Sequence, residues 1–422
     1  MARSQQSKQR QVNQNGHRVD KHIEPLGESG RRGFNPWKFV KISFRSACTA
    51  SALVNVLWPV VPAAIAVRYA RHDLTLAVFI LNYIAMVPYA NLVGFTGQEF
   101  SRKLPRVAGI LIETTIGSVV KIVLFIVLLK GGQFKVIEEA ILGSILATLL
   151  LYLGLCFFVG GMTQDEQKLD EAASEVGNGL LLTAALGLIV PTSFYMTLKN
   201  NEEFGLAYDD LQNKTLQISR ITAIILIIAY GFYVWFNMRT HHSLYDSIFL
   251  REEHQDVDRH KDIRKEKLTM TECIIALVLS IGLVSLIAVN LVEEIPRIVE
   301  DYGVSEMFMG LILVPLVEKF AEHITAIDEV YDNTMNTTMA HVLGATIQTA
   351  MFNGPLTVIA GWGLNLKMDL NFELFTLVIV VLSIIVVGNF LRDMRSNYLE
   401  GALCVLVYVI IAVGAFYFPN HH

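Results

Sequence analysis

The apolar residues of this chain occur in long blocks and do not alternate with polar residues as a water-facing surface requires. Each block is about twenty residues long, which is the length an α-helix needs to cross the hydrocarbon core of a bilayer. The pattern therefore predicts eleven membrane helices. They cover residues 49–70, 75–95, 107–129, 136–160, 178–198, 218–238, 271–293, 306–328, 338–361, 372–391 and 397–418.

The composition agrees with this pattern. Of the 422 residues, 53% are hydrophobic and 17% are charged, whereas a soluble globular protein carries about a quarter charged residues. The four cysteines lie in or beside apolar segments and show no metal-binding spacing. A soluble enzyme, a disulfide scaffold and a disordered chain are excluded, and we expect an all-α polytopic membrane protein.

The charged residues predict how the chain is oriented. The first 45 residues contain ten Lys and Arg, and we interpret residues 1–48 as a basic, disordered tail. If this tail is cytosolic, the loops on its side contain thirteen more basic residues, against eight on the opposite side. Cytosolic loops are enriched in Lys and Arg, so the N-terminus is predicted to be cytosolic. The charged segment 239–270 is predicted to be a cytosolic linker between six upstream helices and five downstream helices.

The two halves of the chain share a sequence pattern. Residues 109–121 are followed after about twenty residues by 141–148, and residues 310–322 are followed at the same spacing by 342–348. Five helices separate the corresponding segments, and because this number is odd, the second copy is inverted in the membrane. The pattern predicts the helix 49–70 followed by two inverted five-helix repeats, 75–238 and 271–418.

Equivalent positions in the repeats carry charged or small residues. Lys121 corresponds to Glu322, and Gly143 corresponds to Gly344. Inverted repeats with such residues in the middle of paired helices are typical of secondary transporters, which bind their ions near the bilayer midplane.

Several short motifs then resemble one known family, the vacuolar cation/proton exchangers, which are Ca²⁺/H⁺ antiporters of fungi and plants within the cation/Ca²⁺ exchanger superfamily. The similarity extends over about residues 50–418. In chain order, the matching motifs are Gln98-Glu99-Phe100, Leu142-Gly143-Ser144, Thr240-His241-His242, Ala321-Glu322-His323-Ile324-Thr325 and Ser396-Asn397-Tyr398-Leu399-Glu400-Gly401.

The resemblance implies a secondary active antiporter that exchanges Ca²⁺ or another cation for protons across a vacuolar or other endomembrane. Its partners would be membrane lipid, the transported cation and protons, with no nucleic acid and no cofactor. An enzyme is not expected, because no HExxH, GxSxG or paired Asp motif lies within the membrane segments.

One departure from the family affects the cation site. In the family, each repeat carries a Gly-Asn-Ala-x-Glu motif, and the two Glu carboxylates face each other at the midplane. Here the second motif reads Glu318-Lys319-Phe320-Ala321-Glu322 and keeps the final Glu, but the first, at 117–121, ends in Lys121. An ammonium 4 Å from a divalent cation repels it by about 8 kcal/mol at an effective dielectric constant of about 20. We therefore expect Lys121 to pair with Glu322 and to oppose Ca²⁺ binding.

Three interpretations of this departure stay open. In the first, the protein is an antiporter whose cation is held by Glu322, the predicted metal ligand, with help from added acids. In the second, it carries a monovalent cation. In the third, it is a transport-inactive relative with a regulatory role. The candidate added acids are Glu113, Glu318, Asp328 and Glu329.

Other candidate residues have both a functional and a structural interpretation. The resemblance implies that His323 carries protons and that Gln348 and Ser144 offer oxygen atoms to an ion. Each of them also suits packing or a hydrogen bond between helices. Glu99 is a candidate for the cytosolic entrance, together with Gln98. Asp328 and Glu329 either line a vestibule or are plain charges at a helix end.

Overall fold

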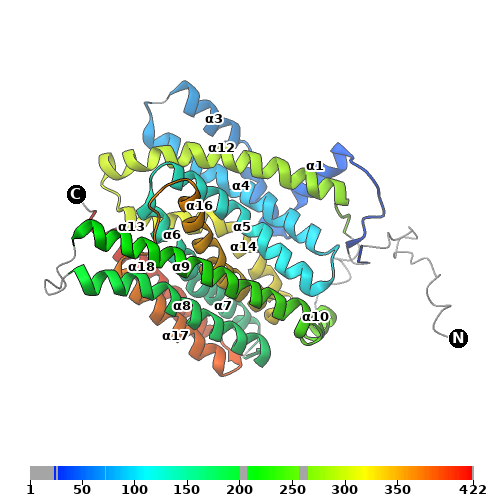
Figure 1. The fold of residues 1–422 in the computed structure, drawn as a ribbon. Helices are drawn as coiled ribbons and strands as arrows, with labels where there is room; N and C mark the ends of the chain where they lie inside the picture. The colour runs from blue at the N-terminus through cyan, green and yellow to red at the C-terminus, as the bar shows by residue number, and fades with distance from the viewer. Residues whose placement is uncertain are drawn as a thin grey trace.

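The computed structural model describes residues 23–24, 27–71, 73–164, 166–199, 207–255 and 265–420. Within these ranges, the side chains of residues 106, 172–173, 253–255 and 321–322 are not described. The described chain is a bundle of long helices, as the sequence predicts (Figure 1).

The first half of the bundle runs from the N-terminal helices to the charged linker. Its elements are α1 (Pro36–Arg45), α2 (Thr49–Val54), η4 (Asn55–Leu57), α3 (Val60–Ala70), α4 (Thr75–Ser101), α5 (Arg106–Lys130), α6 (Phe134–Leu146), η5 (Ala147–Tyr152), α7 (Leu153–Thr163), β1 (Gln167–Lys168), α8 (Glu171–Lys199), α9 (Tyr208–Trp235), η7 (Phe236–Thr240) and α10 (His242–Gln255). The segment η4 is a 3₁₀ turn, whereas η5 and η7 are π-helical turns. In Figure 1, α3 lies at the edge of the bundle beyond α12, and it packs against α4.

The second half repeats the same order. Its elements are α12 (Met270–Tyr302), α13 (Glu306–Phe308), η8 (Met309–Leu313), α14 (Val314–Tyr331), α15 (Met335–Gln348), η9 (Thr349–Asn353), α16 (Gly354–Gly363), α17 (Leu374–Arg392), β2 (Arg395–Ser396) and α18 (Tyr398–Phe416). The segments η8 and η9 are also π-helical. The two short strands pair antiparallel, with Gln167 opposite Ser396, and so join the two halves.

Two matched helices form the centre of the bundle. In each of the continuous helices 134–163 and 335–363, 83% of the most apolar stretch of 18 residues is buried. This share is larger than in any other candidate span among the described residues. Each contains a π-helical turn at the equivalent place, η5 and η9. Because π turns widen a helix locally and are frequent at functional sites, these two turns mark the region where the polar residues of the site gather.

Ten helical stretches of the described residues are long and apolar enough to cross a membrane. The predicted count of eleven is not confirmed, because the remaining segment, 306–328, carries too many charged residues to meet that test. This segment is nevertheless helical as α13, η8 and α14, and α14 packs against α4 and α7 inside the bundle. Two of its charged residues, Glu318 and Lys319, are buried within the protein and belong to the candidate site.

The structure adds a helix to each of two segments, the tail and the linker, whose domain assignments stay predictions. The tail predicted to be disordered over 1–48 includes a helix, α1, which begins with Asn35 accepting a hydrogen bond from Lys38 N at 3.2 Å. An Asn cap and Pro36 in the first turn favour a helix start, and this local signal was overlooked among the basic residues. The linker predicted over 239–270 likewise contains α10. Residues 1–22 and 256–264 lie outside the described residues.

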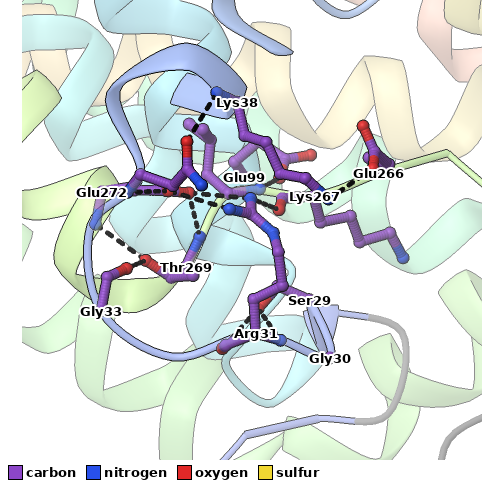
Figure 2. A network of polar contacts seen from close by, with 12 residues as sticks. Ser29, Gly30, Arg31, Gly33, Lys38, Glu99, Glu266, Lys267, Thr269 and Glu272 are labelled. Carbon is purple, nitrogen blue, oxygen red and sulfur yellow. Dashed lines mark hydrogen bonds and ion pairs between the residues drawn. The ribbon is translucent and has the colours of Figure 1, made fainter. Parts of the chain in front are cut away.

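The start of α12 is tied to the segment that precedes α1 (Figure 2). Arg31 donates to both carboxylate oxygens of Glu272 at 3.1 and 3.0 Å, and the Glu272 side chain has no exposed surface. Glu272 and Thr269 also form a capping box at the helix start. Nearby, Lys38 donates to Glu266 at 3.0 Å, and this hydrogen bond lowers the pKa of the Glu266 carboxyl. These contacts hold the N-terminal segment on the face that also carries the linker.

Equivalent glycines of the two repeats are packed differently. A Cβ atom added to Gly143 would lie 2.2 Å from the backbone oxygen of Leu311, because α6 and η8 are in close backbone contact. A Cβ atom added to Gly344 would have its nearest neighbour, Tyr233 Oη, at 3.6 Å. The first distance is a clash, whereas the second is an ordinary van der Waals contact.

We therefore predict that Gly143→Ala destabilises the protein and that Gly344→Ala does not. Overpacking of this kind costs about 1–3 kcal/mol, because α6 and η8 must move apart. The measurement is the thermal unfolding midpoint of each purified variant, and equal midpoints for the two variants would contradict the prediction.

Candidate functional site

Four side chains from four elements meet in the middle of the bundle. Lys121 Nζ of α5 lies 3.2 Å from Glu318 Oε1 of α14, and it donates to Thr349 Oγ1 of η9 at 2.8 Å. Ser144 Oγ of α6 donates to the same Glu318 oxygen at 2.6 Å. The exposed fraction of both charged side chains is 1%. The matched segments of the two repeats thus meet through a buried ion pair.

The helix geometry explains why these groups converge. Lys121 lies past the middle of α5, and Ser144 directly follows Gly143, the glycine at which α6 contacts η8. Thr349 is the first residue of the π turn η9, and its hydroxyl donates to Ala345 O at 2.8 Å. Because this donation uses the hydroxyl proton, the Thr349 oxygen can accept from the Lys121 ammonium.

The formal charges of the four ionisable residues in this region cancel. The ion pair of Lys121 and Glu318 has a net charge of zero, and Lys319, whose residue is 2% exposed, adds a positive charge that also acts on Glu318. With the carboxylate that the sequence places at 322, the four ionisable residues sum formally to zero. A site with this balance differs from one with two unpaired carboxylates, which needs a cation to neutralise it.

The predicted partner of Lys121 was Glu322, and that pairing stays a prediction. Glu322 lies on α14 one turn beyond Glu318, but its side chain is outside the described residues. His323, next in the chain, is buried, and its ring packs against Tyr152 of η5 with ring centroids 4.7 Å apart. Among the described side chains, Glu318 places a carboxylate beside Lys121, and the sequence analysis had placed this residue among the accessory acids.

Two buried amide side chains, of Gln348 and Asn353, lie on the central helix over residues 335–363. Gln348, a predicted site residue, is 1% exposed, and neither its Nε2 nor its Oε1 has a hydrogen-bond partner among the described residues. Asn353, at the end of η9, is also 1% exposed with both amide atoms unpartnered there. Buried amides without partners are costly, so both are suited to receive an ion or water. Asn353 was missed because nothing in its sequence context distinguishes it from a helix-packing residue.

The remaining accessory acids lie apart from the ion pair. Glu113 and Glu329 face each other across His341, towards the end of the bundle that carries the linker. Glu99 instead accepts a hydrogen bond from Leu268 N at 2.9 Å, which links α4 to the start of α12, and Asp328 is exposed on α14. Glu99 and Asp328 are therefore not brought together with the other candidates.

A further charged cluster lies at the opposite end of α6 and was not predicted. Lys135 Nζ lies 2.9 Å from Glu138 Oε2 and 3.8 Å from Glu373 Oε1, and Thr376 Oγ1 donates to Glu139 Oε2 at 2.8 Å. In the neighbouring loop, burial raises the pKa of the Asp369 carboxyl. In the sequence, the polar residues at the start of α6 resemble those of any helix end, so they gave no signal of a cluster.

Removal of one partner from the buried ion pair should be costly, because it leaves the other charge buried alone. We predict that Lys121→Met destabilises the protein by about 3–5 kcal/mol, because it leaves the Glu318 carboxylate buried without its cation. The double variant Lys121→Met/Glu318→Gln should recover most of this loss, since it removes both charges. The measurement is the free energy of unfolding, with Arg395→Met, which removes an exposed partner of Glu166, as the control. A Lys121→Met variant as stable as Arg395→Met would contradict the prediction.

The comparisons with known proteins identify the family and agree with the fold. The family described as sodium/calcium exchanger protein matches residues 74–239 and 273–417. The vacuolar cation/proton exchanger 5 of Arabidopsis thaliana is 31% identical over 382 residues, which are 90% of this chain and 84% of that protein. The vacuolar calcium ion transporter of Schizosaccharomyces pombe is 29% identical over 345 residues, 82% of this chain and 80% of its own. Among solved structures, native YfkE has a TM-score of 0.70 at 26% identity, and covers 86% of this chain and 100% of its own. The chain belongs to the sodium/calcium exchanger family, within its group of vacuolar cation/proton exchangers.

Proposed function

We propose that the protein is a secondary active cation/proton antiporter of a vacuole-like endomembrane in which Lys121 impairs Ca²⁺ exchange. The relatives in Arabidopsis thaliana and Schizosaccharomyces pombe are named as a vacuolar cation/proton exchanger and a vacuolar calcium ion transporter. These names support the transport class, the cation and the compartment. The cytosolic placement of the N-terminus belongs to the same proposal and is supported by the distribution of Lys and Arg.

The observation that carries the proposal is the position of the Lys121 ammonium. It lies 3.2 Å from Glu318 Oε1 and 2.8 Å from Thr349 Oγ1, two oxygen atoms of the kind that Ca²⁺ would otherwise take as ligands. Ca²⁺ requires six to eight oxygen ligands at about 2.3–2.6 Å. An ammonium that already occupies such oxygens acts as a cation fixed to the protein, and a divalent ion must displace it.

The residues left for a transported cation are few. Glu322 supplies the one carboxylate at the family position, and Gln348 and Asn353 can supply amide oxygens. A proton can replace the cation on the carboxylate, which is the simplest basis for exchange. His323, buried against Tyr152, is the proposed neighbour that passes this proton. Ser144 takes part indirectly, since its hydroxyl holds Glu318.

One observation favours a second candidate function. The pair of Lys121 and Glu318 is electrically neutral and needs no ion to balance it. A monovalent cation, with half the charge of Ca²⁺, is repelled by the ammonium half as strongly. Transport of a monovalent cation, or a regulatory role without transport, is therefore the alternative to weak Ca²⁺ exchange.

We predict that wild-type protein takes up Ca²⁺ slowly and that Lys121→Glu raises the rate by about tenfold or more. The substitution restores two carboxylates and removes the repulsion, and each 1.4 kcal/mol of repulsion removed changes the affinity by about a factor of ten. The measurement is ⁴⁵Ca²⁺ uptake into acidified vesicles, with and without collapse of the pH gradient. The triple variant Lys121→Glu/Glu318→Gly/Lys319→Asn, which restores the final Glu of the first motif and the initial Gly-Asn of the second, should be faster still.

The matched control is Lys121→Glu/Glu322→Gln, which should return uptake to background because it removes the carboxylate at the family position. Uptake of ⁸⁶Rb⁺ by the wild type under the same gradient would favour the monovalent alternative. Fast Ca²⁺ exchange by the wild type that Lys121→Glu does not raise would place the cation elsewhere and refute the charge argument.

A further inference from the structure

A cavity lies between the ion pair and the end of the bundle that carries the linker. Its volume is about 50 Å³, whereas one water molecule needs roughly 10–15 Å³ of such space. It is lined at one end by Glu113, Glu329 and His341, and at the other by Gly117 and Tyr152. Gly117 lies one helical turn before Lys121 on α5, so the cavity extends from the three titratable residues to the turn that precedes the ion pair.

The three titratable residues form a chain through the imidazole ring. His341 Nε2 lies 3.9 Å from Glu113 Oε2, and His341 Nδ1 lies 3.6 Å from Glu329 Oε2. Each carboxylate is also held by a hydroxyl: Ser101 donates to Glu113 at 2.7 Å, and Thr338 donates to Glu329 at 3.2 Å. Three different helices, α5, α14 and α15, therefore place one carboxylate on each nitrogen of a single histidine.

This arrangement suits the movement of protons. A histidine can take a proton on one ring nitrogen and release another proton from the opposite nitrogen, and its unperturbed pKa lies near neutral pH. The two gaps of 3.6 and 3.9 Å slightly exceed a hydrogen bond, and a water molecule or a small side-chain movement can close each of them. A metal ion is a poorer occupant, because the two ring nitrogens point to different carboxylates and no metal-binding group was found among the described residues.

The three side chains also have intermediate access to solvent. The exposed fractions of the His341, Glu113 and Glu329 side chains are 15%, 22% and 19%, against 1% for Lys121 and Glu318. They can therefore exchange protons with water that does not reach the ion pair. Glu113 lies eight residues before Lys121, or about 12 Å along the helix.

The charged groups around His341 come from several elements. Glu113 of α5 and Glu329 of α14 face the ring, and Arg102, at the turn between α4 and α5, acts on Glu113. Glu252 of α10 binds the first turn of α15, where it accepts hydrogen bonds from the Asn336 and Thr337 backbone. His341 thus lies between two carboxylates, one near each nitrogen of its ring.

We infer that Glu113, His341 and Glu329 form a proton relay between water at the linker-bearing end of the bundle and the central site. This inference rests on the proposed function, because the relay supplies the proton that is exchanged for the cation. His341 accepts a proton from the carboxylic acid on one side and passes the proton of its other nitrogen to the carboxylate on the opposite side. A flip of the imidazole ring, or exchange of its proton between the two nitrogens through water in the cavity, then restores the starting tautomer, so each cycle moves one proton and atoms and charge balance.

The first test does not depend on transport. Diethylpyrocarbonate labels neutral imidazole, and its attachment to His341 is measured by mass spectrometry between about pH 5 and pH 9, in the full chain reconstituted in lipid. We expect the pH of half-maximal labelling to fall by about one unit in Glu113→Gln and in Glu329→Gln, because each loses a carboxylate that stabilises the imidazolium. Glu166→Gln, which changes an exposed carboxylate, is the matched control. The same half-labelling pH in all four proteins would overturn the relay.

The second test measures cation-driven proton flux in vesicles with an internal pH dye. His341→Asn should reduce the flux by about tenfold or more, both in the wild type and in Lys121→Glu. The control is His241→Asn, which changes an exposed histidine of the linker and should leave the flux unchanged. Unchanged flux in His341→Asn would refute the relay and leave the antiporter proposal standing. If no background transports a cation, the proposed function is refuted, and the labelling experiment still decides whether the three residues share protons.

Discussion

The buried ion pair between Lys121 and Glu318 is the interaction on which the rest of the site depends. It joins α5 of one repeat to α14 of the other, and it binds Ser144 and Thr349 from the two most deeply buried helices. Because a charge in this environment is costly without its partner, the pair both connects the two halves of the bundle and determines which further charges the site can accept.

The two repeats share a plan but are no longer equivalent. Both contain a π turn in the central helix, yet the glycine of the first repeat is in backbone contact with η8, whereas Gly344 has free space for a methyl group. Where the resemblance implies Gly-Asn-Ala-x-Glu in each repeat, the first motif here ends in Lys121 and the second begins with Glu318 and Lys319. These departures are compatible with one another, since Lys121 of one motif lies against Glu318 of the other.

The sequence was sufficient to predict an all-α polytopic membrane fold and the exchanger family, because apolar blocks and short motifs report these features directly, whereas the midplane role of Lys121 stays a prediction. It did not identify Glu318 as the contact of Lys121, because Glu318 and Glu322 are four residues apart and occupy the same face of one helix. His341 was missed because a single histidine in an apolar segment carries no signal until its neighbours from α5 and α14 are known. Helix α1 was hidden by the basic composition of the tail around it.

The most direct measurement is a structure determined by electron cryo-microscopy in millimolar Ca²⁺ at a resolution that shows side chains. If Lys121 acts as a fixed cation, its ammonium remains within hydrogen-bonding distance of Glu318 and Thr349, and no divalent ion lies between α5 and α14. Density for Ca²⁺ coordinated by Glu318, with the Lys121 side chain turned away from it, would contradict the central claim.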